Sequence, residues 1–357
     1  ILNDLYPRKH LNKLSLSNRE KLLSLTPLPW QTPQWTQLMQ QKKADQLAHA
    51  YIVQGDQGLG KRLFVEKFAI ALLCLNKEST DACGECTVCK MAISGSLPDL
   101  LIVEPEEGSR DIKIDQIRLL SNFVNKSSHA GSGKVLILDR AHNLNNSAAN
   151  ALLKTLEEPT STTFIFLVTD LPGALSATIR SRCQRLQFSI ASTEKSSQWL
   201  LEQLPSESDN SAVAVTFASK PLLAFTEGSK GGVEGFSAMI HILSTLLNST
   251  TELRPAVSQT SKIGELLSIG YLIEVSTILI KDLLTESEPR SASTEINGLS
   301  SRLRKSGIES RSLNVKLLNY QQELVKGRHQ LMSGSNPNPQ LIMESLLWQW
   351  TKLFIRP

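Results

Sequence analysis

The segment YIVQGDQGLGKRLF contains most of a phosphate-binding loop. Gly55, Gly60 and Lys61 have the spacing of that motif, and Gly58 lies between them. Between a strand and a helix, such a loop surrounds phosphates with backbone N–H groups, and its lysine reaches the β and γ oxygens. The next position, where a Ser or Thr would bind Mg²⁺, holds Arg62. We therefore expect a degenerate nucleotide site; the alternative is a glycine turn kept only for packing.

The segment KVLILDRA ends an apolar run at an acidic residue. Asp139 stands where phosphate-loop enzymes hold Mg²⁺ through an aspartate. The carboxylate that activates water is expected next, but the chain has Arg140, and a cation cannot act as a general base. Arg62 and Arg140 are thus two independent departures from a working ATPase. For Asp139 alone, a helix cap or a solvated strand end is the alternative.

Four of the five cysteines are clustered in a short segment. Cys74 is followed by Cys83, Cys86 and Cys89, the last three separated by two residues each. Four thiolates at such spacing suit a closed, tetrahedral and therefore structural Zn²⁺ site. An odd total with this clustering argues against a disulfide framework and for a reducing compartment. An iron–sulfur cluster is the open alternative, although the polar intervening residues favour zinc.

Three arginines occur in the segment SATIRSRCQRLQF, at positions 180, 182 and 185. An arginine at the rim of a nucleotide-binding fold can reach a neighbouring subunit and stabilise a transferring phosphate. By spacing alone, however, these residues are better explained as surface or salt-bridged arginines.

The composition describes a globular protein without a membrane span. The 357 residues are 41% hydrophobic and 20% charged, and the net charge is +4, which does not indicate a chain that coats nucleic acid. No apolar run approaches the roughly 18 residues that cross a bilayer, and the first residues do not form a secretory signal. We expect a cytoplasmic protein of two or three domains.

Apolar strands and amphipathic helices alternate through the first half of the chain. Strands are predicted at residues 49–55, 99–105, 134–141 and 163–170, with helices between them. This pattern predicts an α/β fold with a parallel sheet covered by helices on both faces. Ligands bind at the carboxyl ends of such strands, where Gly55, Asp139 and Thr169 are expected. After about residue 189 the pattern becomes entirely helical.

Together, five segments resemble the clamp-loader subunits of bacterial DNA polymerase III, members of the AAA+ superfamily. They are HAYIVQGDQGLGK, the four-cysteine insert, KVLILDRAHNLNNSAANALLKTLEEP, FIFLVTD and TIRSRCQ. The resemblance runs from about Leu28 to Phe188 and weakens beyond. It implies an AAA+ sheet, a small helical lid and an all-α C-terminal collar. The implied boundaries are an N-terminal extension at 1–27, the AAA+ domain at 28–189 with the zinc insert at 74–89, the lid at 190–236 and the collar at 237–357.

Two types of clamp-loader subunit are compatible with these motifs. The ATP-hydrolysing motor subunits, gamma and tau, share the zinc insert and the Ser-Arg-Cys motif, but they keep the loop hydroxyl and an Asp-Glu pair. This chain resembles the non-hydrolysing delta-prime type more, because both features are lost. The opening with Trp30 and Trp35 and the ending NPNPQLIMESLLWQW also resemble that type. In our alignment Leu222 replaces a lid arginine of the motor subunits, which would be a third loss.

The resemblance also implies roles for individual residues. Arg182 would be an arginine finger offered in trans to a neighbouring motor ATPase, positioned by Ser181 and Cys183, and Thr169 would match a polar sensor. The four clustered cysteines would bind Zn²⁺. The degenerate nucleotide site, at which ATP binding is doubtful, would comprise Gly55, Gly58, Gly60, Lys61, Asp139 and Thr169.

The implied partners are the other clamp-loader subunits, namely the motor subunits gamma or tau and the delta subunit. Primed DNA, met through the assembled complex, and the sliding clamp complete the set, and no membrane is involved. Three alternatives remain open: an active motor ATPase, a zinc-dependent nucleic-acid-binding module, and a pure scaffold in which Arg182 does not act.

Overall fold

The computed structural model describes most of the chain in well-defined segments. These are residues 26–76, 81–106, 109, 111–130, 133–158, 162–189, 193–203, 220–222, 225, 233–248, 252–284, 294–305, 309–332 and 337–353. The chain divides into two compact units, residues 1–196 and 197–357. The predicted extension at 1–27 and lid at 190–236 lie largely outside the described residues, and the bounds of the four predicted domains stay predictions.

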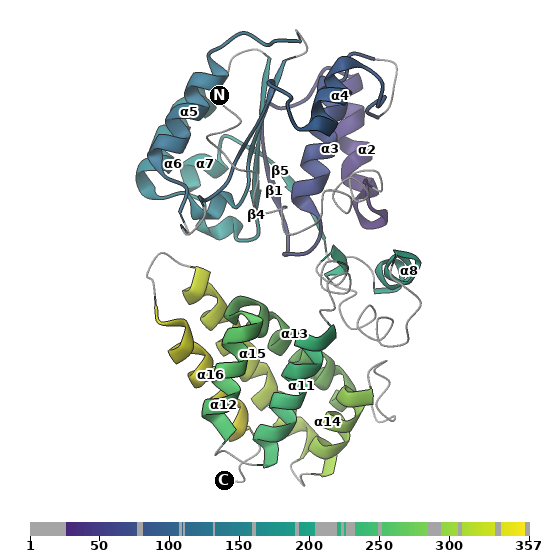
Figure 1. Cartoon of the computed structure of the whole chain (residues 1–357), viewed down its shortest axis with the longest axis vertical. Coiled ribbons are helices and arrows are strands. Elements are labelled where there is room, and N and C mark those ends of the chain that lie inside the picture. Colours follow the sequence, from purple (N-terminus) through teal and green to yellow (C-terminus); the bar gives the residue numbers. More distant parts are fainter. Residues whose placement is uncertain are drawn as a thin grey trace. The chain divides into compact units, whose positions relative to one another are not determined.

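The first unit is built around one parallel sheet (Figure 1), as the sequence predicts. Its order is β2-β3-β4-β1-β5. The strands are β1 (Ala50–Gln54), β2 (Leu100–Val103), β3 (Lys134–Leu138), β4 (Thr163–Thr169) and β5 (Gln184–Gln187). Residues of β1, β3 and β4 are almost all buried, as expected for the central strands of a sheet covered on both faces.

Helices cover both faces of this sheet (Figure 1). On one face lie α2 (Thr32–Lys43), α3 (Lys61–Leu73) and α4 (Thr87–Ser94). On the other lie α5 (Ile114–Val124), α6 (Asn146–Glu157) and α7 (Ala177–Arg180). The described residues of this unit also form three short 3₁₀ helices, at Pro29–Gln31, Ala141–Asn143 and Pro172–Ala174.

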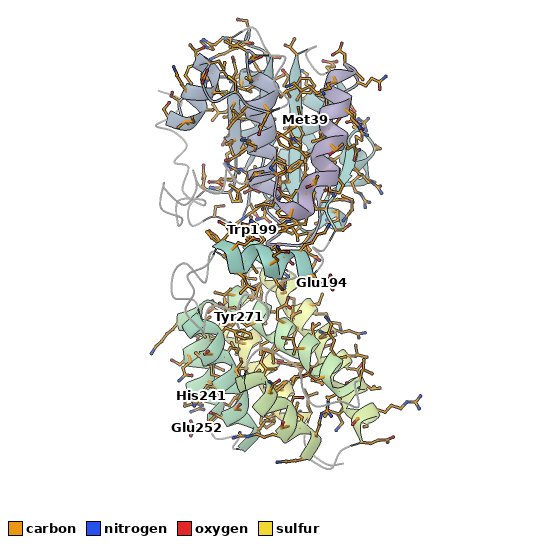
Figure 2. The ribbon with its side chains drawn as sticks, turned by 90° about the vertical axis from the view of Figure 1, so that its right-hand side faces the viewer. Met39, Glu194, Trp199, His241, Glu252 and Tyr271 are labelled. Carbon is orange, nitrogen blue, oxygen red and sulfur yellow. The ribbon has the colours of Figure 1, made fainter. Side chains whose placement is uncertain are left out.

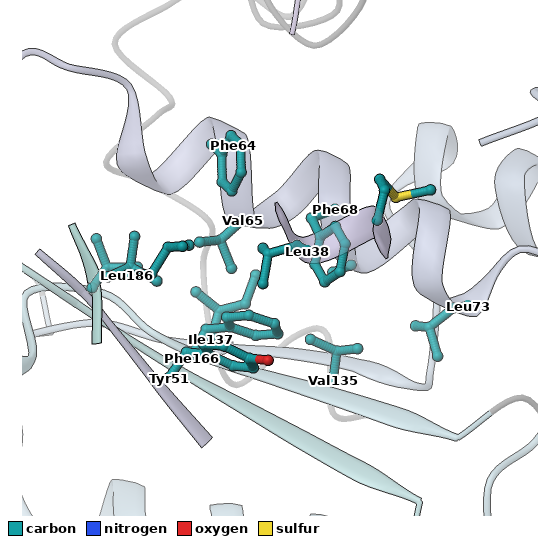
Figure 3. Close-up of a cluster of buried hydrophobic side chains, with 14 of the residues drawn as sticks. Leu38, Tyr51, Phe64, Val65, Phe68, Leu73, Val135, Ile137, Phe166 and Leu186 are labelled. Carbon is teal, nitrogen blue, oxygen red and sulfur yellow. The ribbon is translucent and has the colours of Figure 1, made fainter. Parts of the chain in front are cut away.

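The core between the sheet and α3 combines aliphatic side chains with several aromatic rings (Figure 3). The ring of Tyr51 stacks on that of Phe166 at a centroid distance of 5.4 Å, and Phe68 meets Phe166 edge-on at 5.9 Å. The opposite face is aliphatic, and there Leu156 of α6 and Ile179 of α7 belong to one buried cluster. Neighbouring residues along a strand therefore supply two separate cores, which fixes each strand in its register.

The fifth strand was not predicted. In β5 only Leu186 is buried, and the other three side chains are exposed, because the strand lies at the edge of the sheet. Arg185 pairs with Ile52 and Leu186 with Val53 of β1. A segment with one buried residue carries little periodic signal, so the sequence indicated only the preceding helical turn.

The second unit is helical throughout its described residues. Its helices are α11 (Val233–Asn248), α12 (Leu253–Ile263), α13 (Glu265–Leu284), α14 (Thr294–Lys305), α15 (Ser310–Met332) and α16 (Pro339–Lys352), while α8 (Thr193–Gln203) spans the division between the units. Tyr271 of α13 is 1% exposed and meets Phe236 edge-on at 5.5 Å (Figure 2). Trp350 of α16 is fully buried and donates a hydrogen bond to the carbonyl oxygen of Leu243.

Among the described residues, no single helix has both the length and the apolar composition to cross a membrane. Helices α12 and α13 meet that test only as a pair, and the chain bends by 109° between them.

Candidate functional site

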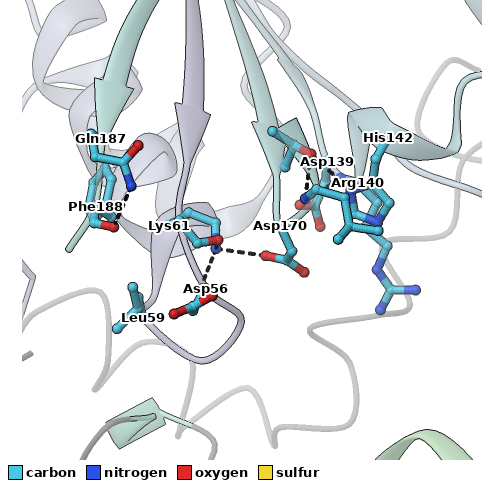
Figure 4. Close-up of polar contacts among 12 residues, drawn as sticks. Asp56, Leu59, Lys61, Asp139, Arg140, His142, Asp170, Gln187 and Phe188 are labelled. Carbon is cyan, nitrogen blue, oxygen red and sulfur yellow. Dashed lines mark hydrogen bonds and ion pairs between the residues drawn. The ribbon is translucent and has the colours of Figure 1, made fainter. Parts of the chain in front are cut away.

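Lys61 points into its own loop (Figure 4). Its Nζ atom donates to the carbonyl oxygens of Gly55 at 2.8 Å and Asp56 at 2.6 Å, and it forms an ion pair with Asp170 at 2.7 Å. A lysine ammonium has three N–H donors. All three are therefore engaged within the protein, and the side chain is only 3% exposed. A phosphate entering this loop would have to displace at least one of these contacts.

The loop glycines have conformations that explain their presence. Gly58 and Gly60 have φ angles of 86° and 80°, a region that strongly favours glycine. Gly55 has φ of 149°, and a Cβ atom there would lie 2.5 Å from the carbonyl oxygen of Phe188. The backbone of Phe188 is held against β1, because its N–H donates a hydrogen bond to the carbonyl oxygen of Gln54. Gly55 is thus required by the packing of the strand ends, whatever the loop binds.

The N-terminal segment braces the loop from the side. Leu59 is fully buried, and its carbonyl oxygen accepts hydrogen bonds from Trp30 Nε1 at 3.0 Å and Gln31 Nε2 at 2.9 Å. Gln31 is itself fixed, because its Oε1 accepts from the backbone N–H of Leu28. These contacts hold the loop in one shape, so the delta-prime-like opening of the chain has a structural role.

Arg62 lies among three carboxylates. Its Nε atom is 2.7 Å from Glu66, and its Nη1 atom is 3.2 Å from Asp139 and 3.8 Å from Glu104. Glu66 is one helical turn further along α3, whereas Glu104 and Asp139 follow the carboxyl ends of β2 and β3. Burial by itself would lower the pKa of the Arg62 guanidinium, but Glu66, Asp139 and Glu104 together raise that pKa above its ordinary value.

The guanidinium therefore supplies the positive charge that a metal ion would bring to such carboxylates. The aspartate predicted to hold Mg²⁺, Asp139, is the one that Arg62 neutralises. Metal ligation by these residues does not fit this arrangement, because the cation of Arg62 already occupies their common centre. Arg62 thus neutralises these carboxylates from the position where the motif expects the hydroxyl that binds the metal ion.

The neighbouring strand ends carry a further polar network (Figure 4). Thr169 is 1% exposed, accepts a hydrogen bond from the backbone N–H of Leu171, and lies 3.1 Å from His142 Nδ1. Burial is the main cause that lowers the pKa of His142; Asp170 and Asp139 oppose it, Arg140 and Lys61 act with it, and the net shift is downward. Arg140 is exposed and has φ of 53°, a conformation rare for a residue with a side chain.

The four clustered cysteines converge on one point. The sulfur atoms of Cys74, Cys83, Cys86 and Cys89 all lie within 4.8 Å of one another. Two pairs, Cys74 with Cys86 and Cys83 with Cys89, are 3.9 Å apart. Tetrahedral zinc with bonds of about 2.3 Å places its sulfurs about 3.8 Å apart. The geometry thus fits one metal ion with four thiolates.

Backbone N–H groups also point at this cluster. The N–H of Cys86 donates to the sulfur of Cys83, and that of Cys89 donates to the sulfur of Cys86, both at 3.4 Å. Such N–H donors stabilise negative charge on the sulfur atoms that accept them. The insert is joined to α3 by an ion pair between Lys67 and Asp81. Cys183 is far along the chain and is not part of the group.

Arg182 lies at the surface between α7 and β5. Its side chain is 36% exposed and forms an ion pair with Glu157 at 2.6 Å. Next to it, Cys183 packs against the aliphatic core, and burial raises the pKa of that thiol to about 12. Ser181 Oγ donates to the carbonyl oxygen of Thr178. The two neighbours therefore fix the backbone beneath an arginine that stays accessible.

Several participating residues were missed by the sequence analysis. Asp170 was included in a predicted strand end without a role, and it pairs with Lys61. Glu66 is spaced four residues from Arg62 along a predicted helix, a signal that was available. Glu104 and Glu157 gave no such signal, because their partners lie on other elements.

A parallel sheet with a phosphate-type loop at its carboxyl edge, followed by a helical unit, defines an AAA+-like protein, here with a loop lysine that is engaged by the protein itself. A family model described as DNA polymerase III, delta subunit, matches residues 30–192. The delta' subunit of DNA polymerase III from Pseudomonas aeruginosa is 32% identical over 327 residues, covering 91% of this chain and 97% of that relative. The chain belongs to the family of DNA polymerase III delta-prime subunits, which confirms the resemblance found in its sequence.

Relatives of the motor type also match, over a smaller part of the chain. The tau subunit from Bacillus subtilis is 37% identical over 141 residues, which are 40% of this chain and 24% of that protein. Among solved structures, a gamma subunit-related protein from Thermotoga maritima is 18% identical and covers 90% of this chain and 100% of its own, at a TM-score of 0.42.

Proposed function

We propose that this chain is the non-hydrolysing subunit of a cytoplasmic clamp loader and that it supplies Arg182 in trans to the ATP site of a neighbouring motor subunit. Membership of the delta-prime family supports the assignment to the complex. The proposed partners are the gamma or tau motor subunits, the delta subunit, the sliding clamp and primed DNA. The helical unit, residues 237–357 in the predicted boundaries, would hold the subunits together as a collar.

The ion pair between Arg62 and Asp139 is the single observation that carries the non-hydrolysing role. Hydrolysis of ATP by a phosphate-loop protein needs a metal held next to the γ-phosphate and a residue that orients water. Here a guanidinium takes the place of the metal ligand, and Arg140 stands where the water-activating carboxylate is expected. Lys61 is also fully engaged by the loop. Each feature separately opposes turnover by this chain.

The position of Arg182 supports the trans role. A guanidinium stabilises the charge of a transferring phosphoryl group when it approaches from outside the site that binds the nucleotide. Arg182 is 36% exposed at the turn between α7 and β5. Its neighbours anchor the backbone, because Ser181 Oγ donates to a carbonyl oxygen of α7 and Cys183 packs against the aliphatic core. The chain thus offers a cation at its surface, while in its own loop Arg62 is already paired with Asp139.

We further propose that the four-cysteine cluster binds one structural Zn²⁺ ion. The ion would neutralise the thiolates and tie the insert to α3 and α4. Without the ion, few buried residues would hold the insert in place. With four protein ligands, no position is left open for catalysis.

The trans role is tested by Arg182→Ala in the complete clamp-loader complex. In the well-studied GTPase case an arginine finger contributes roughly 10³–10⁵ in rate. We expect assembly to be unchanged, by size-exclusion chromatography, and DNA-dependent ATP hydrolysis to fall by at least about tenfold. Arg185→Ala is the matched control, because Arg185 is exposed three residues away on β5. Wild-type turnover in an assembled Arg182→Ala complex would contradict the trans role.

An ATP-hydrolysing motor subunit is the remaining alternative, and the similarity to tau is the observation in its favour. Assays of the isolated chain distinguish the two roles. If the chain is the non-hydrolysing subunit, it should neither hydrolyse ATP nor require Mg²⁺ for any nucleotide binding. Sustained hydrolysis that is abolished by Lys61→Ala would establish the motor role instead.

A further inference from the structure

Arg182 is bound by its own chain in this structure. Its Nη2 atom lies 2.6 Å from Glu157 Oε1. Its Nη1 atom donates to the carbonyl oxygen of Thr178 at 3.1 Å and lies 3.4 Å from Ser181 Oγ. Both terminal nitrogens therefore already have acceptors. A guanidinium that grips a phosphate in the bidentate manner presents two parallel N–H groups to it.

The two partners of this ion pair are held in place by the core and not by each other. Glu157 is the last residue of α6 and follows Leu156, which is 2% exposed. Arg182 follows α7, whose Ile179 is 1% exposed and belongs to the same buried cluster as Leu156. The spacing between the two helices is thus fixed by aliphatic packing. The ion pair can open and close without disturbing the fold.

The local structure of α6 does not account for Glu157. Negative charge at the C-terminus of a helix is unfavourable, because the unpaired carbonyl groups give that end a partial negative charge. Removing the charge should therefore leave the helix intact or stabilise it slightly. The contact with Arg182 is an interaction across two elements that gives this carboxylate a partner.

We propose that Glu157 is a positioning residue, which holds Arg182 in a resting pose and releases it when the triphosphate of a neighbouring subunit approaches. The proposal rests on the trans role of Arg182. A carboxylate 2.6 Å from the guanidinium repels an incoming phosphate and occupies one of the nitrogens that would bind it. The finger is therefore available to a partner only after the contact with Glu157 opens.

The strength of this contact suits a switch of small amplitude. The side chains of Arg182 and Glu157 are 36% and 49% exposed, so water screens their attraction. Exposed pairs of this kind shift an equilibrium by no more than about fivefold. Glu157 thus lowers the fraction of molecules in which Arg182 is free to bind a phosphate, and it does not prevent that binding. This effect should weaken as the salt concentration rises.

The test compares Glu157→Gln with Glu158→Gln in the assembled complex. Glu158 is the adjacent exposed glutamate, so Glu158→Gln removes the same charge from a neighbouring position. At limiting ATP we expect Glu157→Gln to raise DNA-dependent hydrolysis by about two- to fivefold at low salt, and Glu158→Gln to leave it unchanged. Glu157→Ala, which also removes the remaining acceptor, should give at least the same increase. In the Arg182→Ala background neither substitution should have an effect.

The outcomes distinguish the proposed resting pose of Arg182 from the trans role on which it rests. If Arg182→Ala lowers turnover but Glu157→Gln behaves like Glu158→Gln, or lowers turnover, the resting pose is wrong and the trans role stands. If Arg182→Ala has no effect, both proposals fail. An increase that persists in the Arg182→Ala background would show that Glu157 acts by another route, which also overturns the resting pose. Thermal unfolding of each variant verifies that the fold is kept.

Discussion

The guanidinium of Arg62 lies 3.2 Å from the carboxylate of Asp139. In a phosphate-loop ATPase, the first of these positions holds the loop hydroxyl and the second the strand-end aspartate, and both groups hold the Mg²⁺ ion. In this chain the two residues form an ion pair, so the departure at Arg62 and the retained aspartate at position 139 belong to one interaction. The loss of the hydroxyl and the retention of the aspartate are thus explained together, because Asp139 now serves as a partner of the arginine.

Arg62→Ala should destabilise the first unit strongly. It would leave Glu66, which is 1% exposed, together with Glu104 and Asp139 without their common cation. Removing one partner from a buried ion pair costs about 3–5 kcal/mol, and the 16% exposure of Arg62 places the expectation near the lower end. Urea denaturation measures the change. Arg140→Gln, at an exposed arginine, should stay within about 0.5 kcal/mol of wild type; equal losses for both variants would contradict the role given to Arg62.

Gly55→Ala should destabilise the unit whether or not the loop binds a nucleotide. The new Cβ atom would lie 2.5 Å from the carbonyl oxygen of Phe188, and the φ angle of 149° adds backbone strain. A loss of about 2–4 kcal/mol is expected by analogy with overpacked and strained positions. Gly173→Ala is the matched control, since a Cβ atom there meets nothing within 4 Å. If both variants unfold at the same denaturant concentration, Gly55 is not required for packing.

Removal of zinc should expose four thiols and lower the melting temperature. The purified protein is expected to contain one zinc ion per chain, bound by the four clustered cysteines. Structural zinc in small peptides binds with about 10–16 kcal/mol at neutral pH, so its loss must be readily visible. Chelation should let a thiol reagent at pH 8 react quickly with the partly exposed Cys83 and Cys86, whereas Cys183 should react slowly before and after it, because burial raises the pKa of that thiol to about 12.

Two substitutions provide the control for the zinc experiment. Cys74→Ser should reduce zinc content and mimic chelation, whereas Cys183→Ser should keep one ion per chain. Full zinc content in Cys74→Ser, or loss of zinc in Cys183→Ser, would show that the cluster is not the site.

His142 should make the first unit sensitive to mild acid. Burial lowers its pKa in the folded chain, whereas the unfolded value is about 6.5. The unfolded state therefore binds a proton more readily, so stability is unaffected above that value and falls as the pH drops below it. Between pH 7 and pH 5, the melting temperature of His142→Gln should decrease less than that of wild type. His241→Gln, at an exposed histidine of α11 (Figure 2), should decrease as wild type does.

The sequence by itself determined the elements with strong periodic patterns. Four of the five strands and their parallel arrangement followed from apolar runs alternating with amphipathic helices, and the four cysteines stood out by spacing alone. The family followed from the same segments. Among the strands that the structure describes, β5 alone was missed, because an edge strand with a single buried residue, Leu186, has no pattern to detect.

The tertiary structure decided what the chemical groups do. Ion pairs such as Arg62 with Asp139, Lys61 with Asp170 and Arg182 with Glu157 join residues from 25 to 109 positions apart. Charged side chains are long and tolerate many surroundings, so their types and spacing along the chain do not specify a partner. Which carboxylate meets which cation depends on how the buried strands and helices bring the strand ends together, and that is set by packing.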